Sequence, residues 1–213
     1  MQLKIQQLLP AYFDESRKNS SDIWGKDLLF EKGEYIKIVA PSGKGKTSFM
    51  HFLYGLRKDY GGTISFNNED TRQYSQEDFS SLRKNNFSMV FQDLRLFPER
   101  TVWENIEIKR QLNPFHPMQK IKEMCERLGI GNQLGSKTKN CSYGEQQRVS
   151  IIRALMQPYD LLLLDEPFSH LDEDNSKKAM QLMEEESRQR NATIIFADLE
   201  RIDYFPATRL FHL

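Results

Sequence analysis

The glycine-rich segment at residues 40–47, APSGKGKT, constrains the fold of this chain more than any other feature. It follows a run of β-forming residues at 35–40 and precedes an amphipathic segment at 46–57 that we expect to be helical. Glycine lets a strand–loop–helix connection curl so that backbone N–H groups point inward, and the helix N-terminus adds partial positive charge. The segment therefore predicts an α/β domain that binds phosphate groups at the end of a strand.

The order of residues in this loop is close to the pattern GxxxxGKS/T, which binds nucleotide phosphates. Lys46 can reach the β- and γ-phosphates, and the hydroxyl of Thr47 can ligate Mg²⁺. Ala40 stands at the first glycine of the pattern, and because alanine is the smallest replacement we expect slight strain rather than lost binding. ATP and Mg²⁺ are thus the expected cofactors. The predicted nucleotide contacts in the loop are Ser42, Gly43, Lys44, Gly45, Lys46, Thr47 and Ser48.

Two adjacent carboxylates, Asp165 and Glu166, follow a run of four leucines at 161–164. Such a run is typical of a central parallel strand, and ligands bind at the carboxyl ends of these strands. Because side chains alternate along a strand, the two carboxylates should point in different directions. Asp165 suits Mg²⁺, and Glu166 can polarise the water that attacks the γ-phosphate. An incidental acidic pair is the alternative, and the phosphate loop upstream argues against it.

Apolar runs and helical periodicities alternate along the rest of the chain. We expect further strands at 3–8, 63–66, 88–91 and 193–197, and helices at 102–111, 121–128 and 172–190. The side chains expected to face the sheet from the first helix are Phe49, Phe52, Leu53 and Leu56. This alternation predicts a mostly parallel sheet covered on both faces. We expect a single domain at 1–213, with an α/β core at about 1–92 and 158–213 and an inserted helical subdomain at 93–157.

Composition narrows the classes of function. The sequence has 30 basic and 30 acidic residues, so it lacks the positive charge that binds nucleic acid, and we expect no nucleic-acid partner. It has no apolar run of roughly 18 residues, so we expect no membrane-spanning helix. The first residues do not resemble a secretory signal, and we expect a cytoplasmic protein.

Three further segments resemble motifs of one protein family, the nucleotide-binding domains of ABC transporters. Residues 142–148, SYGEQQR, are similar to the family signature LSGGQ, and residues 90–93, VFQD, resemble the Q-loop. Residues 169–172, SHLD, resemble the D-loop. Together with the phosphate loop and the acidic pair, these ordered motifs make the resemblance specific over essentially the whole chain. It implies a P-loop NTPase cassette of the ABC type with an N-terminal antiparallel β subdomain.

The resemblance also implies a head-to-tail homodimer with two ATP molecules between the subunits. The signature residues Ser142, Gly144 and Glu145 would bind the neighbour's ATP, because a loop that opens into a helix binds anions. Gln92 would touch Mg²⁺ or the attacking water and relay the nucleotide state to a membrane partner, and Asp172 would organise the dimer centre. Tyr12 would stack on adenine, with Phe13 as the rival. The expected catalytic residues are Glu166, Lys46 and Gln92, and the expected metal ligands are Thr47, Gln92 and Asp165.

One expected residue is absent. The family ends its next core strand with a histidine that contacts the γ-phosphate, whereas this sequence places Leu199 there, or Ala197 or Asp198 if one residue is deleted. Tyr143 also replaces a signature glycine and can narrow the approach to the neighbour's phosphate. Two hypotheses follow: a working but slow ATPase, or a nucleotide-gated clamp with little hydrolysis. The intact acidic pair favours the slow ATPase.

The most similar type within the family is the compact ATPase of lipoprotein-release, cell-division and macrolide-efflux systems. This resemblance implies a subunit on the inner face of the cell membrane that energises a separate integral membrane permease. A soluble ABC ATPase acting on DNA or ribosomes is the alternative within the family. A small-molecule P-loop kinase would share only the phosphate loop, and the signature at Ser142 argues against it.

Overall fold

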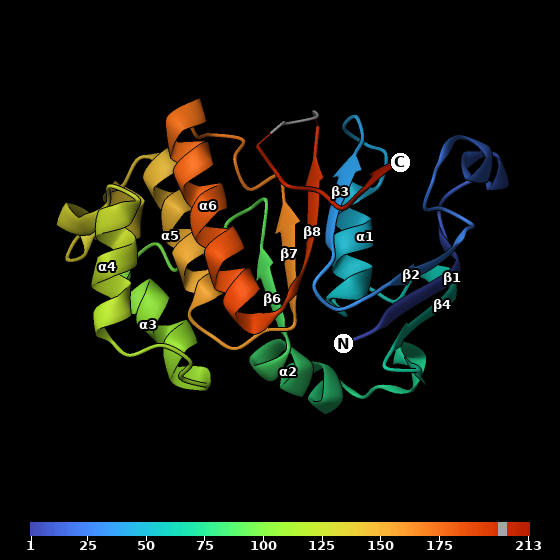
Figure 1. Cartoon of the computed structure of the whole chain (residues 1–213), viewed down its shortest axis with the longest axis horizontal. Helices are drawn as coiled ribbons and strands as arrows, with labels where there is room; N and C mark the ends of the chain where they lie inside the picture. The colour runs from blue at the N-terminus through green and yellow to red at the C-terminus, as the bar shows by residue number, and fades with distance from the viewer. Residues whose placement is uncertain (200–203) are drawn as a thin grey trace.

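The computed structural model describes residues 1–199 and 204–213. Within them, a parallel sheet of five strands forms the centre of the molecule, in the order β6-β7-β8-β3-β9 (Figure 1). Its strands are β3 (Tyr35–Val39), β6 (Phe87–Val90), β7 (Leu161–Asp165), β8 (Thr193–Asp198) and β9 (Arg209–His212). The prediction of a parallel core is confirmed, although β9 was not anticipated.

The four leucines of β7 show why this strand lies in the middle of the sheet. Leu162 and Leu164 pack into a core beneath the long helices on one face, whereas Leu161 and Leu163 pack into a second core on the other face. All four are fully buried. A strand with apolar side chains on both faces is stable only where both faces are covered.

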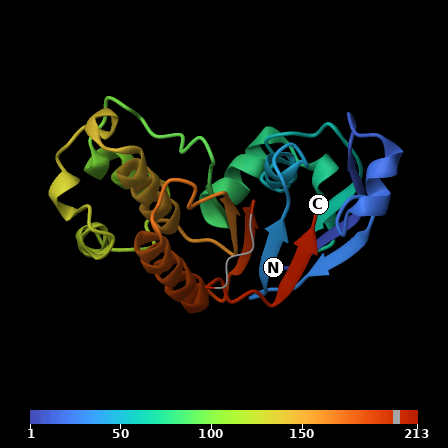
Figure 2. The same ribbon diagram turned by 90° about the horizontal axis from the view of Figure 1, so that it is seen from above.

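A second, antiparallel sheet lies at one end of the molecule (Figures 1 and 2). Its order is β2-β1-β4-β5. The strands are β1 (Leu3–Pro10), β2 (Asp27–Phe30), β4 (Tyr60–Phe66) and β5 (Glu69–Asp70). The buried residues of β1, Leu3, Ile5 and Leu8, join the core that also contains Leu161 and Leu163. The expected antiparallel N-terminal sheet is therefore confirmed, but the short β2 and β5 were missed.

Six α-helices complete the described part of the chain. They are α1 (Lys46–Leu53), α2 (Gln76–Asn85), α3 (Val102–Leu112), α4 (Gln119–Arg127), α5 (Tyr143–Leu155) and α6 (Glu173–Arg190). Short 3₁₀ turns cover Glu15–Ser20, Thr71–Gln73, Gly131–Gln133 and Thr138–Asn140. Helices α3 and α4 lie at the end of the molecule opposite the antiparallel sheet, and α5 and α6 lie between them and the parallel sheet (Figure 1). None of the described helices is both long and apolar enough to span a bilayer.

The first helix is shorter than its sequence periodicity predicts. It ends at Leu53 rather than near Arg57, because Gly55 adopts a left-handed conformation with φ of 70°. Gly55 also packs against the ring of Phe79 from α2, so closely that a Cβ atom would lie 2.1 Å from that ring. The prediction that Leu56 faces the sheet is wrong, since this side chain is 40% exposed. Phe49, Phe52 and Leu53 are buried as expected.

A buried ionic cluster ties the loop between α3 and α4 to α6. Oε2 of Glu186 lies 2.6 Å from Nε2 of His116 and 2.7 Å from Nη1 of Arg190. Glu186 is 2% exposed, and Arg190 also donates a hydrogen bond to the carbonyl of Leu155 in α5. Burial raises the pKa of Glu186, but the hydrogen bonds from His116 and Arg190 outweigh burial and hold that pKa below its usual value. The charged carboxylate is thus compensated within the interior.

We predict that Glu186→Ala lowers the free energy of unfolding by about 3–5 kcal/mol, because it leaves the Arg190 charge buried without its partner. The neighbouring Glu185 is a matched control, since it pairs with Arg127 at the surface and Glu185→Ala should cost under about 1 kcal/mol. Urea denaturation of both variants measures the difference. Equal losses would contradict the compensating role of the cluster.

Candidate functional site

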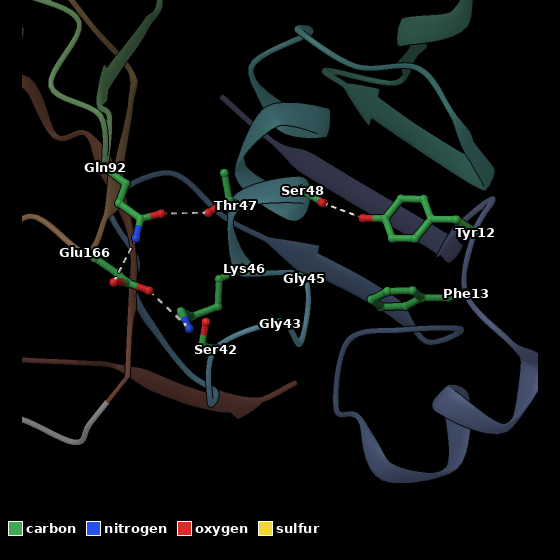
Figure 3. A pocket seen from close by; sticks show the side chains of 10 residues that line it. All are labelled: Tyr12, Phe13, Ser42, Gly43, Gly45, Lys46, Thr47, Ser48, Gln92 and Glu166. Carbon is green, nitrogen blue, oxygen red and sulfur yellow. Dashed lines mark hydrogen bonds and ion pairs between the residues drawn. The ribbon is translucent and has the colours of Figure 1, made fainter.

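The carboxyl ends of four parallel strands meet at one edge of the central sheet. Val39 pairs with Asp198, Asp165 pairs with Ala197, and Val90 pairs with Leu164. A pocket of about 250 Å³ lies at this edge (Figure 3). Its lining residues are Tyr12, Phe13, Ser42, Gly43, Gly45, Lys46, Thr47, Ser48, Gln92 and Glu166. The fold therefore brings most of the predicted site together, from segments far apart in the sequence.

The loop between β3 and α1 is shaped by two glycines. Gly43 and Gly45 have φ of 78° and 99°, which side chains rarely adopt. A Cβ atom at Gly43 would meet nothing within 4 Å, so this residue leaves the mouth of the loop open to a ligand. Ala40 is not among the described residues with positive φ, and its N–H donates to the carbonyl of Asp198 at 3.2 Å. The expected backbone strain at Ala40 is therefore absent.

Lys46 is buried at the base of the pocket. Its ammonium donates to the carbonyls of Ala40 and Pro41, at 2.7 and 3.2 Å, and lies 3.2 Å from Oε1 of Glu166. The ammonium is thus held between the loop backbone and the end of β7 (Figure 3). Lys44, by contrast, does not line the pocket, and its carbonyl accepts a hydrogen bond from the Trp24 indole.

Gln92 connects the loop with the acidic pair. The Thr47 hydroxyl donates to Oε1 of Gln92 at 3.3 Å, and Nε2 of Gln92 donates to Oε2 of Glu166 at 3.2 Å (Figure 3). With the Lys46 contact, these bonds form a continuous chain across the ends of β3, β6 and β7. The chain contains a cation, a carboxylate, an amide and a hydroxyl, which are the groups that phosphoryl transfer uses.

Asp165 is fully buried beside this chain. Neither of its carboxylate oxygens has a hydrogen-bond partner among the described residues. The pKa of Asp165 is raised to about 6, chiefly by burial; the nearby Thr47 hydroxyl and Lys46 lower this pKa, and the charge of Glu166 raises it. Hard divalent cations prefer oxygen ligands. The oxygens of Asp165, Thr47 and Gln92 therefore fit Mg²⁺, and the unpaired carboxylate is the strongest sign of it.

Glu166 occupies a strained backbone conformation. Its φ is 48°, in the left-handed region, and its N–H donates to the carbonyl of Ala197 at 2.9 Å. A non-glycine residue held in this way costs on the order of 1–3 kcal/mol, and such residues gather at functional sites. The conformation turns the Glu166 carboxylate toward Lys46 and Gln92 while Asp165 stays in the sheet, so the two carboxylates are separated as expected.

Both candidate aromatic residues line the pocket. The Tyr12 hydroxyl lies 2.5 Å from the Ser48 hydroxyl, and the guanidinium of Arg57 lies 5.1 Å from the centre of the Tyr12 ring. Phe13 meets Tyr12 edge-on at 4.9 Å and also contacts the Trp24 ring. Tyr12 is 53% exposed, which leaves ring surface available to a planar base. The choice between Tyr12 and Phe13 stays open.

The signature residues lie outside this pocket. Ser142 caps α5, since its hydroxyl accepts from the N–H of Glu145 while the Glu145 carboxylate accepts from the N–H of Ser142. Gly144 packs against the backbone of His170, where a Cβ atom would lie 2.9 Å from the carbonyl oxygen. The Tyr143 ring lies 4.2 Å from the His170 ring. The signature therefore packs on the D-loop of its own chain.

Gln147, which the sequence analysis missed as a contact residue, joins the signature helix to the acidic pair. Its amide nitrogen lies 3.3 Å from the Glu166 carbonyl and 3.3 Å from the Ser169 hydroxyl. Its amide oxygen accepts the N–H of His170 at 3.0 Å. The only sequence signal was the glutamine-rich continuation of the signature, which does not specify these partners.

An ion pair lies at Asp198, one of the three positions that could correspond to the absent histidine. Asp198 ends β8, and its carboxylate lies 3.5 Å from the ammonium of Lys37, which is 2% exposed. The same ammonium lies over the Phe196 ring, and burial lowers the pKa of Lys37 to about 8. Ala197 is buried and Leu199 is 45% exposed, and neither side chain can donate a hydrogen bond to phosphate. The sequence signal for this ion pair was Lys37, a charged residue within the apolar run at 35–40, and it was overlooked.

Comparison with known proteins extends these observations. A family model for ABC transporters matches residues 25–169. The chain is 33% identical over 196 residues to the lipoprotein-releasing system ATP-binding protein LolD of Legionella pneumophila (strain Lens), covering 91% of this chain and 86% of LolD. It is 32% identical over 171 residues to the ABC transporter ATP-binding protein YtrE of Bacillus subtilis (strain 168), covering 79% of this chain and 74% of YtrE.

A longer relative matches over part of its length. The chain is 37% identical over 164 residues to the macrolide export ATP-binding/permease protein MacB of Nitrosomonas europaea. The alignment covers 76% of this chain but only 25% of MacB, so the chain corresponds to about a quarter of that relative.

The solved structures agree on the fold. The ATP-binding cassette MJ0796, in a dimeric post-hydrolysis state bound to ADP and Pi, superimposes with a TM-score of 0.85 at 23% identity, covering 99% of this chain and 94% of MJ0796. This likeness confirms the predicted ABC-type P-loop fold. The chain therefore belongs to the ABC transporter family, as one of its ATPase cassettes.

Proposed function

We propose that two copies of this cassette close around two Mg-ATP molecules, hydrolyse them and drive a separate membrane-spanning subunit. The observation that carries this proposal is the chain of contacts from Lys46 through Glu166 and Gln92 to Thr47. It places a cation, a carboxylate, an amide and a hydroxyl around one pocket beside a phosphate-binding loop. No single element of the fold supplies all of these groups.

The phosphate loop and the residues at the strand ends bind different parts of Mg-ATP. The backbone N–H groups near Gly43 and Gly45 bind phosphate oxygens, and Lys46 balances the charge of the triphosphate tail. Thr47, Gln92 and Asp165 would hold Mg²⁺ through oxygen atoms. The bound ion would supply positive charge to the phosphate oxygens. Tyr12 or Phe13 provides a ring surface for the adenine base.

Glu166 orients the attacking water and accepts its proton. Its carboxylate is held between Lys46 and Gln92, each 3.2 Å away, so it has little freedom to turn out of the pocket. The left-handed backbone at Glu166 supports the same conclusion, because strain of this kind persists only where the surroundings hold it.

A second copy completes the site. The start of α5 offers the hydroxyl hydrogen of Ser142 and the N–H groups of Tyr143 and Gly144 to a phosphate. These groups lie outside the pocket of their own chain, which supports a role at the pocket of a neighbour. Glu145 contributes indirectly, since its carboxylate fixes Ser142.

The ion pair between Lys37 and Asp198 supports slow hydrolysis rather than none. An unpaired aspartate at the end of β8 would repel the γ-phosphate, and the Lys37 ammonium compensates its charge. The γ-phosphate still lacks the hydrogen bond that the histidine would donate. Loss of such a contact in the transition state lowers the rate of hydrolysis by about two to three powers of ten. The nucleotide-gated clamp is the second candidate, and it is favoured by the absence of any donor at Ala197, Asp198 and Leu199.

The proposed membrane partner would dock on a second hollow of about 270 Å³. It lies between the α/β core and α3, which belongs to the inserted helical subdomain that we propose at 93–157. Its lining residues are Tyr54, Met89, Phe91, Arg95, Phe97, Asn105, Ile108, Lys109, Arg153 and Ala154. Phe97 is 51% and Ile108 is 43% exposed, so apolar surface is available to a partner. LolD is named an ATP-binding protein of a lipoprotein-releasing system, and MacB is named a macrolide export ATP-binding/permease protein; these names support a place on the cytoplasmic face of the membrane.

We predict that Glu166→Gln lowers the rate of ATP hydrolysis by about a hundredfold or more, because the amide cannot accept a proton. Mg-ATP should then stay bound to the variant and hold it as a dimer. Size-exclusion chromatography with light scattering measures this dimer. Glu123→Gln on the exposed face of α4 is the matched control and should behave as the wild type. A Glu166→Gln protein that stays monomeric in saturating Mg-ATP and retains no nucleotide would overturn the dimer model.

We predict that Asp165→Asn stabilises the protein at pH 7 without Mg²⁺ while it abolishes Mg²⁺-dependent hydrolysis. The pKa of Asp165 is raised to about 6, so its ionisation destabilises the folded state as pH rises from the unfolded value through 6. Removing that charge should raise the free energy of unfolding by about 1–3 kcal/mol. Thermal melts in EDTA, and again in Mg²⁺, measure the effect. A lower melting temperature for the variant in EDTA would contradict an uncompensated carboxylate.

A further inference from the structure

The turn that follows Gln92 is fastened to α5 by one side chain. Nη1 of Arg153 donates to the carbonyl of Arg95 at 2.6 Å, and Nη2 donates to the carbonyl of Leu94 at 2.6 Å. Arg153 lies 58 and 59 residues away from these partners in the sequence. A single guanidinium therefore holds two consecutive carbonyl groups of another segment.

The turn itself is strained. Leu94 and Arg95 have φ of 57° and 48°, so two consecutive non-glycine residues occupy the left-handed region. Such a conformation persists only where neighbouring groups hold it. Local contacts help, since the N–H of Leu94 bonds to the Phe91 carbonyl and the Arg95 guanidinium lies over the Phe91 ring at 4.1 Å. Arg153 supplies the contact from outside the turn.

The turn determines where Gln92 lies. Strand β6 ends at Val90, two residues before Gln92, so the sheet does not fix the Gln92 backbone directly. The Gln92 amide must nevertheless contact Thr47 and Glu166 on two other elements, at 3.3 and 3.2 Å. Relaxing the turn would move the backbone that carries this amide, and both contacts would be lost together.

We propose that Arg153 is a positioning residue for hydrolysis, which acts through the carbonyls of Leu94 and Arg95 to hold Gln92 against Thr47 and Glu166. The inference rests on the proposed hydrolysis at this pocket. Arg153 does not line the nucleotide pocket, so it should affect turnover without affecting the grip on the phosphates. It does line the hollow proposed for the membrane partner, so a segment that enters there meets this contact directly.

Arginine is the residue that this arrangement requires. Its planar fork presents two N–H groups to two neighbouring carbonyls, whereas lysine offers one compact ammonium. Burial lowers the pKa of Arg153 to about 10, so the guanidinium stays charged at neutral pH and its hydrogen bonds are charge-assisted. Both Arg153→Lys and Arg153→Gln thus remove the planar guanidinium. Arg153→Lys keeps the positive charge, whereas Arg153→Gln removes it.

The test compares these two variants with the wild type and with Arg127→Gln, a surface arginine paired with Glu185. Arg153→Gln should lower kcat by about tenfold and leave the Kd for a fluorescent ATP analogue within about twofold, because the Gln92 amide loses its contacts with Thr47 and Glu166 while the phosphate loop is intact. Arg153→Lys should show a smaller loss of kcat. Arg127→Gln should change neither value.

A second change separates positioning from folding. Asparagine adopts the left-handed conformation more readily than arginine. Adding Arg95→Asn to Arg153→Gln should therefore restore part of kcat, and the recovery should be incomplete because the contact of Arg95 with the Phe91 ring is removed. Hydrogen exchange at the amides of Leu94 and Arg95 should be faster in Arg153→Gln and slower again in the double variant. Hydrogen exchange does not depend on ATP hydrolysis. If the wild type proved inactive, the proposed function would be refuted, and the exchange rates would still test whether Arg153 holds the turn.

Unchanged kcat and unchanged exchange in Arg153→Gln would overturn the proposal. Parallel losses of ATP affinity and melting temperature, with no recovery in the double variant, would make Arg153 a folding residue and overturn it as well. Failure of both Arg153 variants to fold would lead to the same conclusion.

Discussion

The parallel pairing of β3, β8, β7 and β6 is the constraint on which the site depends. It ends four strands at one edge, so that the loop after Val39, Glu166 after β7 and Gln92 after β6 share a single pocket. Burial of β7 on both faces holds this register, because a slip of one residue would place Asp160 or Asp165 in a core position that a leucine now fills. The pocket is therefore a consequence of how the core packs.

Several unfavourable features of the structure lie at the same edge. Asp165 is a buried carboxylate without a hydrogen-bond partner, and Glu166 is a left-handed residue other than glycine. Leu94 and Arg95 add a strained turn beside Gln92. Proteins keep such features where function needs them, and the rest of the fold compensates for them. In this cassette the compensation comes from the apolar core and from clusters such as Glu186 with His116 and Arg190.

Two features distinguish this chain from the family pattern that its motifs resemble. The end of β8 has no histidine at Ala197, Asp198 or Leu199 and carries an aspartate paired with the buried Lys37, and the signature carries Tyr143, whose ring packs on His170. The first change removes a donor from the phosphate and limits the repulsion that an unpaired aspartate would add. The second places an aromatic pair on the surface that a neighbouring subunit would approach. Together they favour slow turnover.

The sequence by itself determined the phosphate loop, the strand and acidic pair at Leu161–Asp165 and Glu166, and the family, because these depend on local order and spacing. It also predicted most strands and helices. It missed α2, in which Phe79 is the only buried residue, and it extended α1 past Gly55 to about Arg57. Only the tertiary structure revealed the contacts of Lys37, Gln147 and Arg153, whose partners lie 19 to 161 residues away. Such contacts depend on the path of the whole chain, and no local pattern records that path.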